Sequence, residues 1–330
     1  MSARTWSCAW RESARAFWSS EEPASHFSTS VNGKMADRIA LLVRDVDERL
    51  GHPADFTVVD IGCGDGRLLS LVRDRCGDRA ERMRWIGIDV RPVRVAGVEA
   101  IVAEVPAELS VPSIHGLVMA HEWLDEIPCD VVERDGEGVD RLILVERDGT
   151  EVQGPPLGDE DACAELGVDA RETREWIDRW WPLAEPGDRA EIGVPRDSAW
   201  AWLARLVDTG TLLATDYGHV RREREGRHRH GTLAAYRAGR LVRPAADGSV
   251  NLTAHVAVDS LAAALPGTRI TTQREEIAVG PVGDDARAVE IERYVASLRL
   301  RDPGRLGGVS WLHWDADRNA PLSASTLPMW

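Results

Sequence analysis

The chain has 330 residues, 43% of them hydrophobic, five scattered cysteines and a formal net charge of −15 at pH 7. This length fits one domain with an insertion or two domains, and the negative charge argues against a nucleic-acid partner but accommodates a cationic one. The chain shows no C-x-x-C spacing, signal-peptide core or apolar run near ~18 residues, so we expect a cytoplasmic protein without a metal site or a membrane span.

Residues 1–34 are expected to form an N-terminal helical and loop segment. Residues 1–20 combine four aromatic side chains with small and charged residues, which predicts a short amphipathic helix. Packing of this helix on the protein body is favoured over a membrane-surface role, because its polar side is not strongly basic. Residues 19–33 have the composition of a loop, and apolar spacing predicts a helix over 35–50.

A glycine-rich turn follows the first predicted strand of the main fold. The run 56–61 carries Asp60 near its end and leads into Gly62, Gly64 and Gly66, after which a helical pattern begins. Glycines let the turn bend sharply and let a ligand lie against the backbone, facing the positive N-terminus of the helix. Dinucleotide-binding turns usually have G-x-G-x-x-G. This spacing instead resembles the first motif of class I S-adenosylmethionine (SAM) methyltransferases, with an ordinary strand–turn–helix as the alternative.

Acidic residues end the next predicted strands as well. Residues 84–89 form a strand that ends in Asp89, whose carboxylate can accept both ribose hydroxyls of a nucleoside. A short strand over 100–103 precedes Glu104, and a strand over 116–120 runs into His121 and Glu122. Strands that alternate with helices indicate a parallel, doubly wound sheet, which binds ligands at the carboxyl ends of its strands. The cofactor-binding residues predicted at this edge are Asp60, Gly62, Gly64, Gly66, Asp89, Glu104 and His121.

An inserted subdomain is expected over residues 129–190, covering the cleft. Alternating residues with turns at two Asp-Gly pairs predict a β-hairpin over 130–149. Residues 154–158 are predicted to be a linker, and residues 161–181 a charged helix. We therefore expect the main domain to be split into a SAM-binding half, 35–128, and a second half, 191–330.

The second half is predicted to complete the sheet. Asp197 is expected to cap a helix that runs to Val207, and residues 210–219 to form the fifth strand and its exit loop. The basic run 221–230 is interpreted as a solvated loop. A helix over 261–265 and antiparallel strands over 269–278 and 309–314 are expected to follow.

Glu122 and Asp125 are the predicted catalytic residues. Methyl transfer is an in-line displacement, so the protein mainly positions the acceptor. Carboxylates can orient a cationic nitrogen acceptor and stabilise its charge, and a spacing of three residues could place both on one helical face. In the alternative interpretation, this segment is only a helix N-terminus and Asp125 is exposed.

Several ordered segments resemble the MidA-like methyltransferases, which include the mitochondrial complex I assembly arginine methyltransferase. His121–Pro128 resembles the family signature N/H-E-hydrophobic-hydrophobic-D-x-hydrophobic-P, and Thr215–His219 is similar to its D-Y-G-H segment. Further similar segments are His26–Ser30, Gly231–Tyr236, Asn251–Val258 and Thr272–Glu276. The resemblance covers about residues 26–315. Departures from the family pattern include Asn251, Ala234 and the pair Ala257-Val258.

The resemblance implies a Rossmann-like class I fold: a doubly wound, mostly parallel seven-stranded sheet with an inserted β-hairpin and helical subdomain and an N-terminal helical segment. It also implies a SAM-dependent methyltransferase, and for the mitochondrial member symmetric dimethylation of a protein arginine. We therefore expect methyl transfer to a nitrogen acceptor, such as a protein arginine. The alternatives are a small-metabolite methyltransferase and a non-catalytic SAM-binding assembly factor. The sequence leaves the oligomeric state open.

Overall fold

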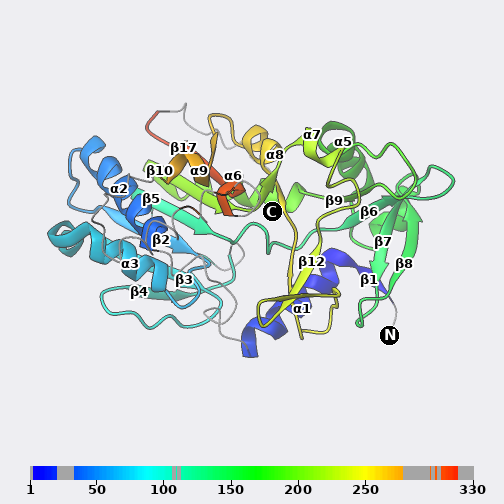
Figure 1. Ribbon diagram of the computed structural model, residues 1–330, viewed down its shortest axis with the longest axis horizontal. Coiled ribbons are helices and arrows are strands. Elements are labelled where there is room, and N and C mark those ends of the chain that lie inside the picture. Colours follow the sequence, from blue (N-terminus) through cyan, green and yellow to red (C-terminus); the bar gives the residue numbers. More distant parts are fainter. Residues whose placement is uncertain are drawn as a thin grey trace.

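A seven-stranded mixed sheet forms the larger part of the protein (Figure 1). The computed structural model describes residues 3–20, 33–105, 109, 113–277, 298, 302 and 306–318. Five neighbouring strands are parallel, and β17 is antiparallel to both of its neighbours. The sheet is thus mixed, and its parallel part places the acids at one edge. Its order is β16 (Arg269–Thr272), β17 (Ser310–Asp315), β10 (Val207–Asp216), β5 (Ile114–His121), β2 (Thr57–Ile61), β3 (Arg84–Asp89) and β4 (Glu99–Val102).

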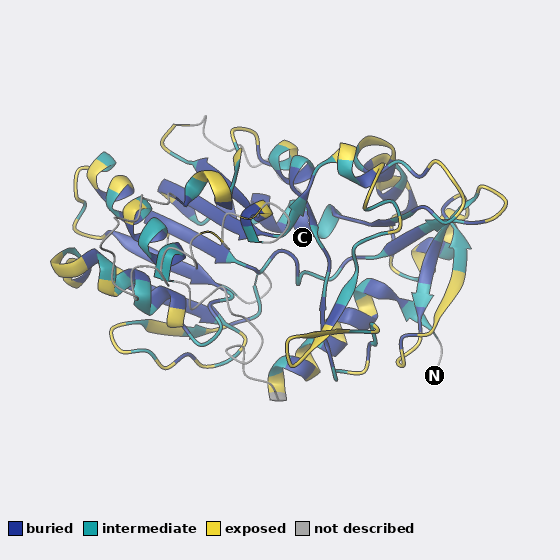
Figure 2. Ribbon diagram, in the orientation of Figure 1, coloured by how far each residue is buried: buried dark blue, intermediate teal, exposed yellow. Residues whose placement is uncertain are grey.

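Helices cover both faces of this sheet because its central strands are apolar on both sides. In β2, Val58 packs into a core with α2 (Gly33–Arg49) and α3 (Arg67–Cys76). Val59 packs into the opposite core with α6 (Val194–Ala204) and α8 (Val258–Ala264). Every residue of β2 is buried, and the central strands are dark blue in Figure 2. This two-sided burial is typical of a doubly wound sheet.

A second sheet lies beside the first and contains the predicted hairpin. Its core is formed with α4 (Glu160–Glu165) and α5 (Ala170–Trp180), so the predicted helix over 161–181 is in fact two helices. Gly167, with φ +78°, lies in the break between them. The order of the sheet is β1 (Arg4–Thr5), β7 (Asp140–Val145), β6 (Val131–Arg134) and β9 (Arg189–Glu191), with β8 (Glu151–Pro156) also paired to β7.

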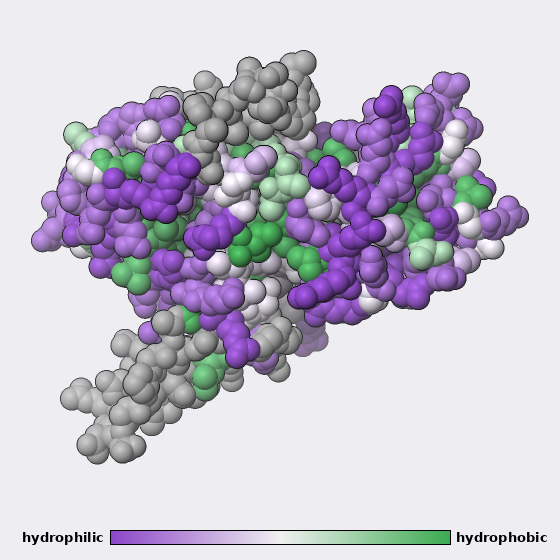
Figure 3. Space-filling view, turned by 90° about the horizontal axis from the view of Figure 1, so that it is seen from above, coloured by the Kyte–Doolittle hydropathy of each residue, from purple (hydrophilic) through white to green (hydrophobic). Residues whose placement is uncertain are grey.

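Smaller elements join the two sheets. A three-stranded sheet has the order β13 (Arg240–Val242), β12 (Ala234–Arg237) and β14 (Asn251–Thr253), and β11 (Gly218–His219) pairs with β15 (Val256–Ala257). Within the described ranges, further helices are α1 (Trp6–Ser20), α7 (Arg221–Arg224) and α9 (Gln273–Glu276), and 3₁₀ turns span Gly77–Arg82 and Leu306–Gly308. The face of the protein shown in Figure 3 is mostly hydrophilic where it is coloured, with hydrophobic residues gathered near its middle.

Most predicted elements are confirmed, and several are wrong. The amphipathic helix over 1–20 exists as α1 and is packed on the body through Trp6 and Trp10. The linker predicted over 154–158 is instead largely strand β8. The strand predicted over 269–278 ends at Thr272 and gives way to α9. The loop predicted over 19–33 and the segment His26–Ser30 lie mostly or wholly outside the described residues.

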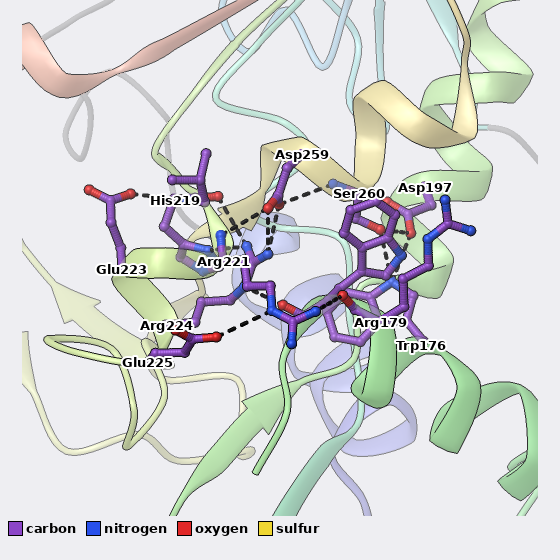
Figure 4. A network of polar contacts seen from close by, with 12 residues as sticks. Trp176, Arg179, Asp197, His219, Arg221, Glu223, Arg224, Glu225, Asp259 and Ser260 are labelled. Atoms are coloured by element: carbon purple, nitrogen blue, oxygen red, sulfur yellow. Dashed lines mark hydrogen bonds and ion pairs between the residues drawn. The ribbon is translucent and has the colours of Figure 1, made fainter. Parts of the chain in front are cut away.

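Asp197 does not cap a helix. Helix α6 begins at Val194, three residues earlier, with a proline in its first turn. The Asp197 carboxylate instead accepts hydrogen bonds from Trp176 Nε1, at 2.8 Å, and from Ser260 Oγ (Figure 4). Asp197 therefore ties α6 to α5 and α8.

The basic run 221–230 is not wholly a solvated loop. It starts with α7, and Arg224 is 1% exposed. The Arg224 guanidinium contacts both carboxylate oxygens of Asp259, at 2.7 and 2.8 Å (Figure 4). It also donates to Trp180 O. A buried, paired arginine of this kind anchors the run to α5 and α8.

Candidate active site

A cavity of about 690 Å³ lies at the carboxyl ends of the parallel strands. Its wall is built from the segments that follow β2, β3, β4 and β5, together with one face of α1. The volume falls within the roughly 300–1,000 Å³ that is typical of small-molecule and cofactor sites. The predicted site residues that line it are Asp60, Gly62, Gly64, Asp89, Glu104, His121 and Glu122.

The glycine turn shapes one wall of the cavity. Gly62, Gly64 and Gly66 have φ of +66°, +60° and +76°, a region that favours glycine. A Cβ on Gly62 would lie 2.6 Å from the ring of Trp123, whereas one on Gly66 would lie 2.7 Å from Val93. Gly66 is the N-terminal cap of α3 and is not part of the cavity wall. The turn thus presents Gly62 and Gly64 to a ligand, and Gly66 serves close packing.

Two carboxylates stand beside the turn. Asp60 is 2% exposed, and its Oδ1 has no hydrogen-bond partner in the described part of the chain. Burial, and then the charge of Asp89, raise the pKa of Asp60 well above its usual range. Asp89 accepts hydrogen bonds from the backbone N–H groups of Gly64, at 2.9 Å, and Arg91, at 3.1 Å. Burial raises the pKa of Asp89, and these backbone bonds oppose the rise.

Beyond β5 the chain makes a turn rather than the expected helix. Glu122 has φ +49°, in the left-handed region, which is uncommon for a residue with a side chain. The carboxylate of Asp216 accepts the backbone N–H groups of Leu124, at 2.9 Å, and Asp125, at 3.1 Å, and so fixes the turn. The prediction that Glu122 and Asp125 share a helical face is therefore wrong, and so is the alternative of a helix N-terminus.

Glu122 lines the cavity with a polar but uncharged neighbour. His121 Nδ1 lies 2.6 Å from Thr215 Oγ1, and burial lowers the pKa of His121 to about 4, so the ring is neutral at pH 7. His121 Nε2 lies 3.9 Å from Glu122 Oε1. Tyr217 also makes a side-chain hydrogen bond to Glu122. The Glu122 carboxylate thus lies at the cavity next to His121 and Tyr217, neither of which carries a positive charge.

Asp125 lies behind the cavity wall. It is 4% exposed and is not a lining residue, so the expectation that it is exposed fails. Its Oδ2 accepts a hydrogen bond from Thr253 Oγ1 at 2.6 Å. Burial raises the pKa of Asp125, and the nearby Glu122 charge adds to the rise. This position suits a residue that supports Glu122 more than one that contacts a substrate.

Sequence reasoning missed the contribution of α1 and of Glu126. The helix lines the cavity with Arg11, Arg15 and Trp18, which have helical spacing and so share a face. Glu126 also lines it and accepts the indole N–H of Trp18 at 3.1 Å. The spacing of these three α1 residues was the available signal, but it could not show which part of the protein the face would contact.

The parallel strands, the glycine turn and the acids at one edge define an α/β protein whose ligand cavity lies at the carboxyl ends of its parallel strands. Residues 39–274 match the model of the family described as "Putative S-adenosyl-L-methionine-dependent methyltransferase". The chain belongs to this family and is a SAM-dependent methyltransferase.

Two crystal structures from Burkholderia thailandensis share the fold, each at 16% sequence identity and over 98% of this chain. One, an "uncharacterized ACR, COG1565 superfamily protein", is covered over 90% of its length with a TM-score of 0.74. The other is described as a COG1565 superfamily member and "likely methyl transferase" bound to S-adenosyl-homocysteine (SAH). It is covered over 92% of its length with a TM-score of 0.72. A comparison with curated proteins finds no match.

Two further findings concern the described residues only. None of their helices has the length and apolar character needed to span a bilayer. No three His, Cys, Asp or Glu side chains among them are grouped in a way that could hold a metal ion.

Proposed function

We propose that this methyltransferase transfers the methyl group of SAM to a nitrogen acceptor on a protein side chain, such as arginine. The observation that carries the proposal is Glu122, whose carboxylate lines the cavity beside the neutral ring of His121, at 3.9 Å, and Tyr217. A carboxylate in a partly dry site stabilises positive charge strongly. A nitrogen acceptor gains positive charge as it is methylated, whereas an oxygen acid or thiolate loses negative charge.

The residues of the cavity fit SAM. Gly62 and Gly64 line the cavity with backbone alone, and Asp60 Oδ1, which has no partner among the described residues, suits the ammonium of the methionine moiety. Asp89, fixed by two backbone bonds, has remaining lone pairs for the ribose hydroxyls. When bound, SAM supplies an electrophilic methyl group on a sulfonium.

Glu104 and His121 have less direct roles in this proposal. Glu104 is tied to Arg15, with N–O distances of 2.6 and 3.0 Å, and so contributes to the wall as an ion pair. His121 Nε2 is buried without a hydrogen-bond partner among the described residues, which leaves it available to a ligand. Asp125 and Thr253 act from behind by fixing the turn that carries Glu122.

Support for arginine as the acceptor comes from the resemblance to MidA-like methyltransferases. The segment His121–Pro128 carries the main signature, and its Glu122 is one of the residues that line the cavity. Support for SAM binding also comes from the B. thailandensis protein with SAH bound, which has the same fold. Membership of a methyltransferase family favours an enzyme over the non-catalytic assembly factor.

The test is methyl transfer from SAM with a labelled methyl group to a lysate of the source cells, separated into protein and small-metabolite fractions. We expect label in protein, recovered after hydrolysis as methylated arginine. Label confined to metabolites would favour the small-metabolite alternative. Absence of label in both fractions, from a protein that still binds SAH, would favour the assembly factor. Glu122→Gln serves as the low-turnover control.

A further inference from the structure

Helix α1 joins the two parts of the protein. In Figure 1 it starts beside β1 and the second sheet and runs toward the main sheet. Trp6 and Trp10, in the first half of α1, are 1% and 0% exposed. They pack into a hydrophobic core that includes Val131, Val145 and Leu252. Trp6 Nε1 also donates to Glu151 at 2.7 Å. This half of α1 is therefore fixed independently of the cavity.

The second half of α1 forms a wall of the cavity. Arg11, Ala14, Arg15, Trp18 and Ser19 are lining residues. Arg15 pairs with Glu104, which follows β4, and the guanidinium of Arg91, which follows β3, lies 5.9 Å from the Trp18 ring centroid. The helix thus contacts the same strand ends that carry the predicted ribose site.

Glu126 connects this wall to the turn after β5. One carboxylate oxygen accepts the indole N–H of Trp18 at 3.1 Å, and the other accepts the side-chain N–H of Asn251 at 2.9 Å. Asn251 is the first residue of β14. Each oxygen of Glu126 therefore has one donor, and the three side chains form a bridge from α1 through the turn to β14.

We propose that α1 is a cofactor-binding element, held over the cavity by the Trp18–Glu126–Asn251 bridge, so that release of SAH requires this bridge to open. The residues of α1 precede the segment matched by the family model, so family membership gives them no role. The proposal depends on the binding of SAM and SAH and not on the identity of the methyl acceptor.

The first experiment measures SAH affinity by calorimetry and SAH dissociation by stopped flow. Trp18→Ala should raise the Kd for SAH at least about tenfold and speed dissociation, because ring contacts and a hydrogen bond are lost. Trp18→Phe keeps a ring but loses the N–H, so its Kd should rise about threefold. Glu12→Gln is the matched control: Glu12 is exposed on α1 and pairs with Arg4, so SAH binding should not change.

The second experiment exchanges the two partners of one hydrogen bond. In Asn251→Asp the new carboxylate faces the carboxylate of Glu126 with no donor between them, and SAH binding should weaken about threefold or more. Adding Glu126→Gln lets its amide donate to that carboxylate while its oxygen still accepts from Trp18, which should restore the Kd to near that of the original protein. The exchange conserves size, which protects the fold.

Unchanged SAH affinity and dissociation in Trp18→Ala and Asn251→Asp would overturn the proposal. A double variant that binds SAH no better than Asn251→Asp would also overturn it. Failure of methyl transfer to nitrogen, with these SAH effects intact, would overturn only the proposed acceptor.

Discussion

The carboxylate of Asp89 accepts the backbone N–H of Gly64 at 2.9 Å, so the end of β3 is hydrogen-bonded directly to the glycine turn that follows β2. Two features that the sequence places 25 residues apart are therefore a single structural unit. A ligand that binds against the glycine turn must therefore also contact the Asp89 carboxylate.

Removal of this carboxylate should weaken cofactor binding. In Asp89→Ala, the loss of charge-assisted hydrogen bonds to the ribose should cost roughly 1.5–3 kcal/mol, or about 10- to 150-fold in the Kd for SAM. Calorimetry with SAM measures this. Glu99→Ala, on exposed β4, is a control that should bind SAM normally. An Asp89→Ala protein with the original affinity would remove Asp89 from the site.

Glu122 should act in methyl transfer more than in SAM binding. Glu122→Gln keeps the shape of the side chain but removes its charge, so turnover should fall by ~10²-fold or more, the scale of one preorganised electrostatic contact. SAM affinity and the melting temperature should change little, because the residue caps no helix. The three quantities are measured on one preparation. Normal turnover in a folded, SAM-binding variant would rule out the catalytic role.

Gly62 should not tolerate a side chain. Its φ of +66° is unfavourable for alanine by about 1–2 kcal/mol, and a Cβ would collide with Trp123. We expect Gly62→Ala to lower the free energy of unfolding by at least that amount and to weaken SAM binding as Trp123 moves. Urea unfolding checks the first effect. Gly136→Ala, at a position with open space around it, should be nearly neutral.

Asp197 should make stability fall as pH rises. Burial raises its pKa from 3.8 to about 7. At a pH between these two pKa values, the folded protein keeps a proton on Asp197 that the unfolded chain has lost. The free energy of unfolding therefore falls as the pH rises, and the loss is complete above pH 7, at roughly 4 kcal/mol. Asp197→Asn removes this cost. The gain in free energy of unfolding of the variant over the original protein should therefore be larger at pH 8 than at pH 5, as measured by urea unfolding. An identical difference at both pH values would contradict the raised pKa.

Local sequence signals predicted the strands and the glycine turn. The runs that contain Asp60 and Asp89 form β2 and β3 at nearly the predicted residues, since buried parallel strands are continuous apolar runs. The glycines have positive φ, as a sharp turn requires. These features depend on neighbours in the chain, and so the sequence contains the information to find them.

The errors arose where distant residues decide the local structure. The turn after β5 is fixed by Asp216, more than 90 residues further along the chain, and no local pattern reveals those bonds. Strand β8 contains Pro155 and Pro156, which suggested a linker, but a strand paired on one side tolerates proline. The helix after Gly193 starts at Val194 because Pro195 suits its first turn, and Asp197 is drawn to α5 and α8 instead.

The position of α1 has a consequence for the order of assembly during synthesis. The helix leaves the ribosome before the elements that it contacts: β1 pairs with β7, about 140 residues later, and Trp18 reaches Glu126, which in turn is held by Asn251. Contacts so distant in sequence form late, because closing a long loop costs chain entropy before any contact forms. A nascent chain could thus build the glycine turn and β3 early but finish its cofactor cavity only after most of the polypeptide has been made. Newly synthesised enzyme would then remain unable to retain SAM until both halves of the protein have folded.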